Sequence, residues 1–146
     1  MSSTPEHDRG GSGYVSRIER RTTLPMETAS VRLARTFVVR AIEQWTPNVD
    51  ADMVALATSE VVTNALTHAG GDVTLTVRLD DGTLRVEVGD TSGTLPVVGP
   101  FTPDATSGRG MYIVDSVADA WGVDQVPDDG KVVWFAMASR PDVLSG

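Results

Sequence analysis

Two short segments joined by Asp81-Gly82 constrain the fold of this chain more strongly than any other feature. Apolar side chains occupy every second position in residues 73–79 and again in residues 84–88, with mostly polar side chains between them. This alternation is typical of β-strands that have one buried side and one solvent-facing side. A two-residue Asp-Gly connection suits the tight turn of an antiparallel hairpin. The sequence therefore predicts a hairpin whose apolar face must be covered by other elements.

Helical segments are available to provide that cover. Residues 27–45 and residues 111–120 carry apolar side chains at three- and four-residue steps, which is the pattern of an amphipathic helix. A third helix is predicted between Asp50, which suits an N-cap, and the pair Gly70-Gly71, which stops it. We therefore expect three helices to pack on the sheet that contains the hairpin.

Further strands complete the predicted order of elements. Residues 14–24, 121–126 and 132–138 alternate loosely or strictly between apolar and polar side chains. Strands that are adjacent in sequence usually pair with one another. The order β-α-α-β-β-loop-α-β-β therefore predicts an α+β fold of two layers, with a largely antiparallel sheet and three helices on one face.

Length and charge limit the organisation and the partners of the chain. A chain of 146 residues fits one domain, which we place at residues 14–140, between a disordered tail at 1–13 and a short tail at 141–146. A net charge of −8 disfavours binding to nucleic acid or to an anionic membrane. No apolar run is long enough to span a bilayer, and we expect a cytoplasmic protein.

Glu60 and Asn64 are the most informative polar residues of the predicted central helix. On a helical projection they lie within about 60° of each other, together with Thr67, and apolar residues flank them. Burying an amide without a partner costs roughly 2–7 kcal/mol. A polar group from elsewhere is therefore expected to meet this pair.

Three other features follow these two residues along the chain. Asp90 ends the predicted hairpin, a long loop rich in glycine and proline comes next, and Gly108-Arg109-Gly110 opens the last helix. In this order, and with the segment Glu60–Ala69, the chain resembles the ATP-binding domain of the GHKL superfamily. It is most similar to the small bacterial anti-sigma factor serine/threonine kinases of that superfamily. The resemblance covers about residues 25–138 and implies the Bergerat-type ATP-binding fold.

The resemblance implies roles for Glu60 and Asn64 in phosphoryl transfer. Asn64 would ligate Mg²⁺ through its amide oxygen, and the metal would also bind the phosphates of ATP. Glu60 would be the catalytic general base, which takes a proton from the hydroxyl of a partner's serine or threonine, or from water. A carboxylate in this role must lie within hydrogen-bonding reach of that proton.

The resemblance also implies how the rest of the nucleotide is held. Asp90 would accept a hydrogen bond from the amino group of adenine. Gly108 and Gly110 would let the backbone approach the phosphates at the start of a helix, where free N–H groups attract anions. Arg109 is a further candidate for phosphate binding, and residues 91–107 would form a lid over the nucleotide.

Each of these residues also has a purely structural explanation. Glu60 could form an ion pair with an arginine of the first helix, and Asn64 could bond a nearby backbone group. Asp90 could cap a turn, which is a common use of aspartate after a strand. Gly108 and Gly110 could simply interrupt the loop. The functional interpretation depends on the order and spacing of all these residues together.

The chain departs from the superfamily pattern at two places. Ser92 and Thr94 occupy the positions at which the first glycine box usually has glycine. Val132 is expected where the last strand often has a threonine that supports the adenine-binding aspartate. Losing one such hydrogen bond would cost about 0.5–1.5 kcal/mol, so the resemblance allows for weak nucleotide binding.

Two functions follow from the resemblance. The first is an ATP- and Mg²⁺-dependent serine/threonine protein kinase that phosphorylates an anti-sigma antagonist and sequesters a sigma factor. The second is a binding module without catalytic activity, which exchanges protein partners and has weak or no nucleotide binding. A homodimer through the first strand and first helix is a further expectation.

Overall fold

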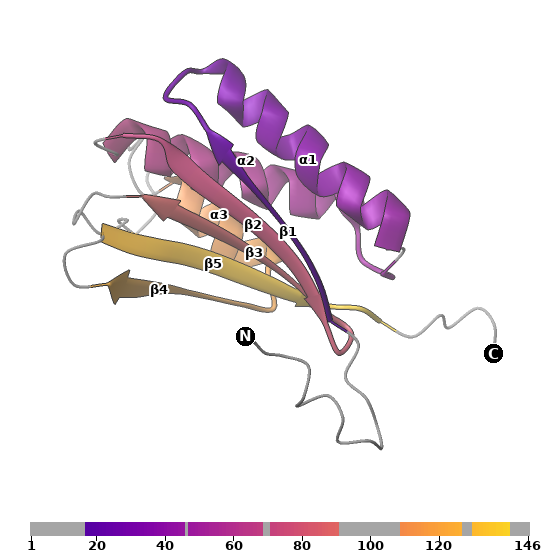
Figure 1. The fold of residues 1–146 in the computed structure, drawn as a ribbon. Helices are drawn as coiled ribbons and strands as arrows, with labels where there is room; N and C mark the ends of the chain where they lie inside the picture. The colour runs from indigo at the N-terminus through magenta and orange to yellow at the C-terminus, as the bar shows by residue number, and fades with distance from the viewer. Residues whose placement is uncertain (1–16, 46, 69–70, 91–108, 127–129, 141–146) are drawn as a thin grey trace, which may run out of the picture.

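The computed structural model of the chain describes residues 17–45, 47–68, 71–90, 109–126 and 130–140. These residues form five strands and three helices (Figure 1), in the predicted order. The elements are β1 (Arg17–Leu24), α1 (Ala29–Trp45), α2 (Ala51–His68), β2 (Val73–Asp80), β3 (Thr83–Asp90), α3 (Arg109–Val117), β4 (Ala120–Val126) and β5 (Gly130–Ala138). The predicted tails at 1–13 and 141–146 lie outside the described residues.

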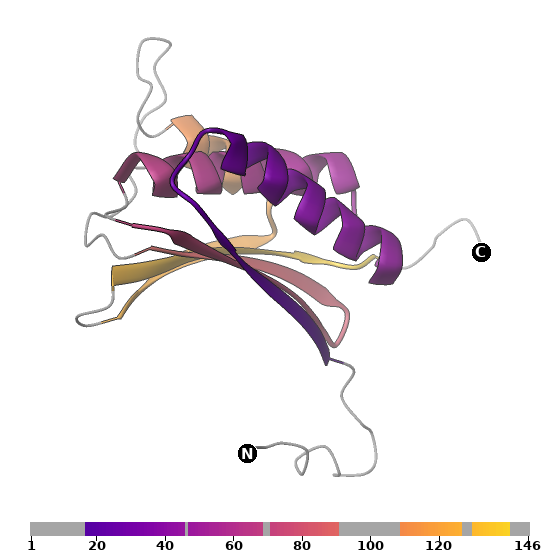
Figure 2. The same ribbon diagram turned by 45° about the horizontal axis from the view of Figure 1, so that its top comes forward.

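The described strands form one sheet, in the order β1-β2-β3-β5-β4, and every neighbouring pair is antiparallel. Figure 2 separates a layer of strands from a layer of helices that covers one face of the sheet. The predicted α+β fold of two layers is therefore confirmed. The predicted hairpin is confirmed as well, because β2 and β3 are joined at Asp81 and Gly82, whose φ angles are 53° and 85°. Positive φ at both positions is the backbone of the type I′ turn, which Asp-Gly favours.

The core fills the space between the two layers. Alternate residues of β2, β3 and β5 face the helices and are buried, and α1 and α2 contribute a stripe of buried side chains each. The sheet provides Leu75, Val86 and Phe135, and the helices provide Val38 and Val54, among others. Removing apolar surface from water stabilises the fold by roughly 25 cal/mol per Å², so this layer is the main source of stability. Among the described helices, none is long and apolar enough to cross a membrane.

Helix α2 begins where the sequence predicts. The Oδ1 atom of Asp50 accepts hydrogen bonds from the backbone N–H groups of Asp52 (3.0 Å) and Met53 (3.2 Å). These bonds satisfy two donors that the start of a helix leaves without partners. The predicted end of the last helix was wrong, because α3 stops at Val117. The N–H of Asp119 already donates to the carbonyl of Ala136 in β5, so the chain has joined the sheet by that residue.

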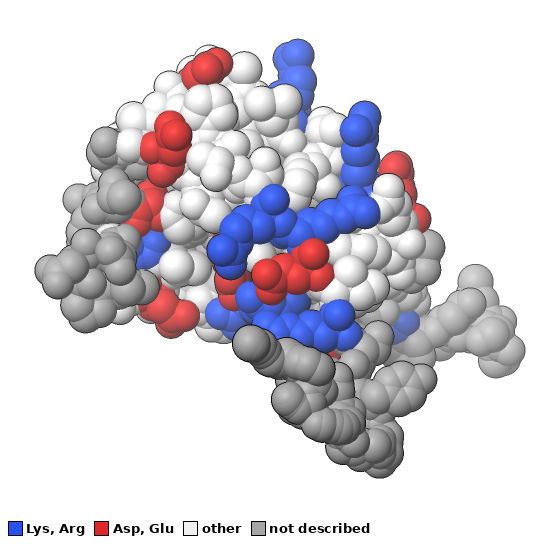
Figure 3. Space-filling view, viewed as in Figure 1, with Lys and Arg blue, Asp and Glu red and all other residues white. Residues whose placement is uncertain are grey.

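The face of the sheet away from the helices carries paired charges. Arg78 on β2 donates to Glu19 on β1 and to Glu87 on β3, both at 3.0 Å, and Arg85 donates to Glu87 at 2.7 Å. We call these four residues the open-face network. In the space-filling view, acidic atoms near the centre are enclosed by basic ones (Figure 3). Burial lowers the pKa of Arg78, but hydrogen bonding and charge attraction to Glu19 and Glu87 outweigh it and raise this pKa overall.

An aromatic residue lies next to the open-face network. Trp134 of β5 has the guanidinium carbon of Arg85 4.0 Å from the centroid of its ring. On the other strand beside it, Gly122 of β4 leaves no room for a side chain, since a Cβ there would lie 2.8 Å from the ring. The ring therefore rests directly on the backbone of β4.

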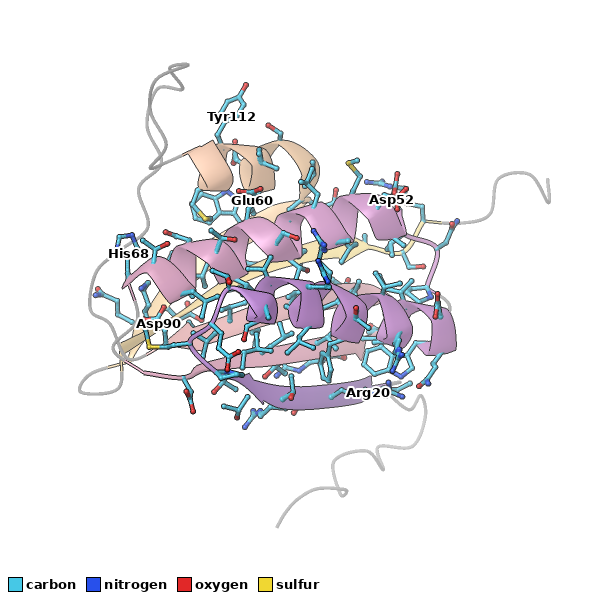
Figure 4. All side chains as sticks on the ribbon, turned by 90° about the horizontal axis from the view of Figure 1, so that it is seen from above. Arg20, Asp52, Glu60, His68, Asp90 and Tyr112 are labelled. Atoms are coloured by element: carbon cyan, nitrogen blue, oxygen red, sulfur yellow. The ribbon has the colours of Figure 1, made fainter. Side chains whose placement is uncertain are left out.

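The first strand is an edge of the sheet, as predicted. Arg20 of β1 lies on its helix-facing side (Figure 4), where its guanidinium is 5.6 Å from the centroid of the Trp45 ring and donates to Gln44. These contacts attach the edge strand to the end of α1.

Candidate functional site

Glu60 lies where α2 meets the beginning of α3. Gly110, the second residue of α3, packs directly over it: a Cβ at Gly110 would lie 2.9 Å from Oε1 of Glu60 and 3.4 Å from its Cβ. Figure 4 shows Glu60 on α2 beneath α3. The absence of a side chain at Gly110 therefore lets the first turn of α3 approach the carboxylate. The resemblance implied roles for both residues in one nucleotide site, and the structure brings them into contact.

Glu60 has no partner of its own among the residues that the structure describes. It forms neither an ion pair nor a hydrogen bond there, although Arg32, Arg35 and Arg40 of α1 are all described. The structural alternative, in which Glu60 pairs with an arginine of the first helix, is therefore wrong. Its side chain is half-buried, and the acceptor positions of its carboxylate are available among the described residues.

Asn64 follows Glu60 by one turn of α2 and is also half-buried. Within the described part of the chain its carboxamide makes no hydrogen bond, which leaves the backbone-bonding alternative without support. The hydroxyl groups around it behave differently. Thr67 donates to the carbonyl of Thr63 (2.8 Å), and Ser59 donates to that of Ala55 (3.0 Å). Glu60 and Asn64, the two residues that the sequence singled out, thus both lack a hydrogen-bond partner within the described part of the chain.

Asp90 ends β3 and is buried, with a residue exposure of 4%. Its carboxylate oxygens accept hydrogen bonds from the ammonium of Lys131 on β5, at 3.2 Å and 3.1 Å. Lys131 is itself only 2% exposed. The two residues are directly opposite each other in the pairing of β3 with β5, so their side chains project to the same, helix-covered face of the sheet.

The register corrects the expected position of Val132. Val132 lies opposite Gly89, and its Cγ2 atom is 3.7 Å from where a Cβ of Gly89 would be. Because side chains alternate along a strand, Val132 faces away from the helices and cannot support Asp90. The residue that supports Asp90 from the last strand is Lys131. The prediction was wrong by one position, which places the side chain on the opposite face of the sheet.

Lys131 is therefore the residue that reasoning from the sequence missed. One signal was available, because Lys131 is the only lysine in a chain with 12 basic residues. A second signal was the alternation of β5, in which Lys131 shares a face with Val133 and Phe135, both buried. A charged residue in phase with core residues indicates a buried partner of opposite charge.

Several predicted residues lie outside the described part of the chain. These are Gly108, the side chain of Arg109, and the proposed lid at 91–107, which includes Ser92 and Thr94. The described residues place Glu60 and Asn64 along α2 and Gly110 over Glu60. Figure 4 shows Asp90 and His68 toward one end of the molecule, where β3 and α2 finish. The described residues thus provide an available carboxylate and an available carboxamide on α2, the carboxylate lying against the start of α3, and a buried ion pair at the end of β3.

The chain is similar to a known protein family. The model of the histidine kinase-like ATPase domain matches residues 24–137 of the chain. No curated protein matches the chain.

Proposed function

The chain belongs to the histidine kinase-like ATPase domain family, and from that premise we propose that it binds ATP and Mg²⁺ between α2, the start of α3 and the end of β3. We further propose that it is a serine/threonine protein kinase of the anti-sigma factor type. The observation that carries this proposal is the half-buried carboxylate of Glu60, which lacks a partner among the described residues and lies against the start of a helix.

Glu60 is the proposed general base. An available carboxylate next to a helix start is suited to accept the proton of an attacking hydroxyl group, while the helix start favours the phosphate that the hydroxyl attacks. When bound, ATP supplies the phosphoryl group and Mg²⁺ neutralises part of its negative charge. The acceptor is the hydroxyl of a partner's serine or threonine, or water in its absence.

The amide oxygen of Asn64 is a suitable ligand for a magnesium ion that is bound to a nucleotide. Within the described residues, no cluster of three or more His, Cys, Asp or Glu side chains is arranged to hold a metal. Asn64 alone would therefore provide one amide oxygen, and phosphate oxygens and water would provide the remaining ligands, as is usual for Mg²⁺ in nucleotide sites. Gly108, Arg109 and Gly110 are proposed to bind the phosphates, and the first turn of α3 provides free N–H groups.

Asp90 is proposed to accept the hydrogen bond of the adenine amino group. Its burial at the end of β3 supports this role, because a buried carboxylate has a fixed position and a low-dielectric surrounding in which a hydrogen bond to it is strong. With adenine at Asp90, at the end of β3, the phosphates are proposed to lie closer to the start of α3.

The proposed partners are a sigma factor and an anti-sigma antagonist, and the proposed location is the cytoplasm. The charge of −8 supports protein partners rather than direct contact with nucleic acid or a membrane. A homodimer through β1 and α1 is proposed as well. These partners rest on the resemblance of the motifs to anti-sigma factor kinases.

A second candidate function is a partner-exchange module without catalysis. Ser92 and Thr94 in place of glycines favour it, and so does the ion pair with Lys131, which already occupies both oxygens of Asp90. In that case the ion pair would hold β3 and β5 together, and protein contacts alone would provide the regulation.

Calorimetry separates the two candidate functions. We expect titration of the full chain with Mg-ATP to give a heat of binding, and radiolabelled ATP to transfer its terminal phosphate to a serine or threonine of the antagonist. Absence of binding heat at millimolar nucleotide would favour the partner-exchange module. Binding without transfer or hydrolysis would retain the nucleotide site and remove the kinase activity.

A further inference from the structure

Lys131 has more hydrogen-bonding capacity than its ion pair uses. A protonated lysine has three N–H donors and no acceptor. Both hydrogen bonds of this ammonium go to the carboxylate of Asp90, and among the described residues no other acceptor meets it. Because Lys131 is 2% exposed, the remaining donor cannot rely on bulk water. A buried donor without a partner is unfavourable, so an acceptor is expected at this position.

A role in holding the sheet together does not account for this lysine. The pairing of β3 with β5 continues over eight residue pairs, from Thr83 with Ala138 to Asp90 with Lys131. Apolar residues of similar size often stabilise a core as well as a buried ion pair or better, because they avoid the desolvation of two charges. The pair lies at the end of β3, next to the proposed nucleotide site, where a ligand can complete its hydrogen bonds.

The ion pair presents an acceptor and a donor side by side. Asp90 can only accept hydrogen bonds when it is ionised, and Lys131 can only donate them. Adenine carries a matching arrangement, since its 6-amino group donates and a ring nitrogen on either side of that group accepts. We propose that Lys131 determines the specificity for the base by donating to the ring nitrogen beside the amino group, N1 or N7, while Asp90 accepts from the amino group. This inference rests on the proposed function.

The same pair rejects guanine. At the 6-position guanine has a carbonyl oxygen, which accepts, and its N1 carries a proton, which donates. With the 6-position held at Asp90, an acceptor would face the carboxylate. If Lys131 contacts N1, a donor would also face the ammonium, whereas a contact to N7 would leave the discrimination to Asp90 alone. A site discriminates strongly against a base that cannot make these hydrogen bonds, because the buried polar atoms of the site then remain unpaired.

Deaza analogues of ATP test the inference on the wild-type chain. We expect either 1-deaza-ATP or 7-deaza-ATP, in which a C–H replaces the ring nitrogen, to bind about ten- to a hundredfold more weakly than ATP by calorimetry. The analogue that loses affinity identifies the nitrogen that Lys131 contacts. GTP is expected to bind more weakly than ATP as well. Equal binding of ATP and both analogues would overturn the inference and leave the proposed nucleotide site intact.

A variant without the ion pair provides the matched comparison. The double substitution Asp90→Asn with Lys131→Met removes both charges together and so avoids leaving one of them buried alone. In this variant the ratio between ATP and the sensitive analogue should fall to about one, and circular dichroism would verify the fold. A ratio that stays at the wild-type value would assign the sensitivity to another residue. No binding of ATP by the wild-type chain would instead refute the proposed function, and the inference with it.

Discussion

Two groups of charged residues lie on opposite sides of the sheet, one on its open face and one on the side that the helices cover, and they differ in how completely their hydrogen bonds are made. In the open-face network, Glu87 accepts from both Arg78 and Arg85, and Arg78 also reaches Glu19. On the helix-covered side, Glu60 has no partner among the described residues, and Lys131 has a donor that its ion pair does not use. Charges that satisfy one another support the fold, whereas on our proposal the incompletely paired charges interact with a ligand.

The largest effect is expected from Glu60→Gln. The amide cannot take a proton, so transfer or hydrolysis should fall by about a hundred- to ten-thousandfold. Binding of Mg-ATP and the free energy of unfolding should stay nearly unchanged, because the carboxylate has no partner to lose. Radiolabelled transfer, calorimetry and thermal unfolding measure the three quantities. Glu43→Gln on the exposed side of α1 is the control, and unchanged transfer in Glu60→Gln would remove this residue from the mechanism.

Lys131→Met tests whether the buried pair also contributes to the fold. Removing one partner leaves the carboxylate of Asp90 buried without its cation, which costs about 3–5 kcal/mol of stability. Chemical denaturation measures this loss. The double variant with Asp90→Asn should recover most of it, because neither charge is left alone. If the single and double variants were equally unstable, the effect would come from packing and not from charge.

Gly122→Ala tests the open face. The new methyl group would lie 2.8 Å from the Trp134 ring, which is rigid and rests under Arg85, so we expect a loss of about 1–3 kcal/mol. Nucleotide binding should not change. Gly89→Ala is a matched control on the same face, where a methyl group would have ordinary contacts of 3.7 Å and 3.9 Å. Equal stability of both variants would show that the ring can move aside.

Gly110→Ala makes the corresponding change at the start of α3. Here the methyl group would lie 2.9 Å from Oε1 of Glu60, which is the mobile end of a flexible side chain. The carboxylate can move, so stability should change little, but we expect a loss of about tenfold in transfer because the base is displaced. Gly71→Ala, where no atom lies within 4 Å, is the control. A large loss of stability in Gly110→Ala would contradict the proposed mobility of Glu60.

The smallest effect is expected from Glu87→Gln in the open-face network. The variant keeps the shape of the side chain but weakens its charge-assisted bonds to Arg78 and Arg85, at a cost of about 0.5–1.5 kcal/mol. High salt should reduce the difference between the variant and the wild type. Transfer and nucleotide binding should be unaffected. A loss of nucleotide affinity would show that the two faces of the sheet are coupled.

Local sequence signals predicted most of the fold. The hairpin follows from alternation and from Asp81-Gly82, and the start of α2 follows from Asp50, because each of these depends only on neighbouring residues. Roles for Glu60 and Gly110 in one nucleotide site were implied by the resemblance, and the contact between the two residues was not predicted. The role of Lys131 was not predicted, because the register of β5 against β3 is set by packing between segments that are distant in sequence. The end of α3 was misplaced because pairing in the sheet overrides helical periodicity after Val117.

The burial of Lys131 also allows chemical labelling of this residue to measure local opening of the domain. It is the only lysine in the sequence, and in the folded domain its side chain is almost fully enclosed. An amine-directed reagent can modify this side chain only when the residues that cover it move away. The rate of acylation therefore measures how often the pair of Asp90 and Lys131 is uncovered, and a nucleotide that contacts the pair should slow it.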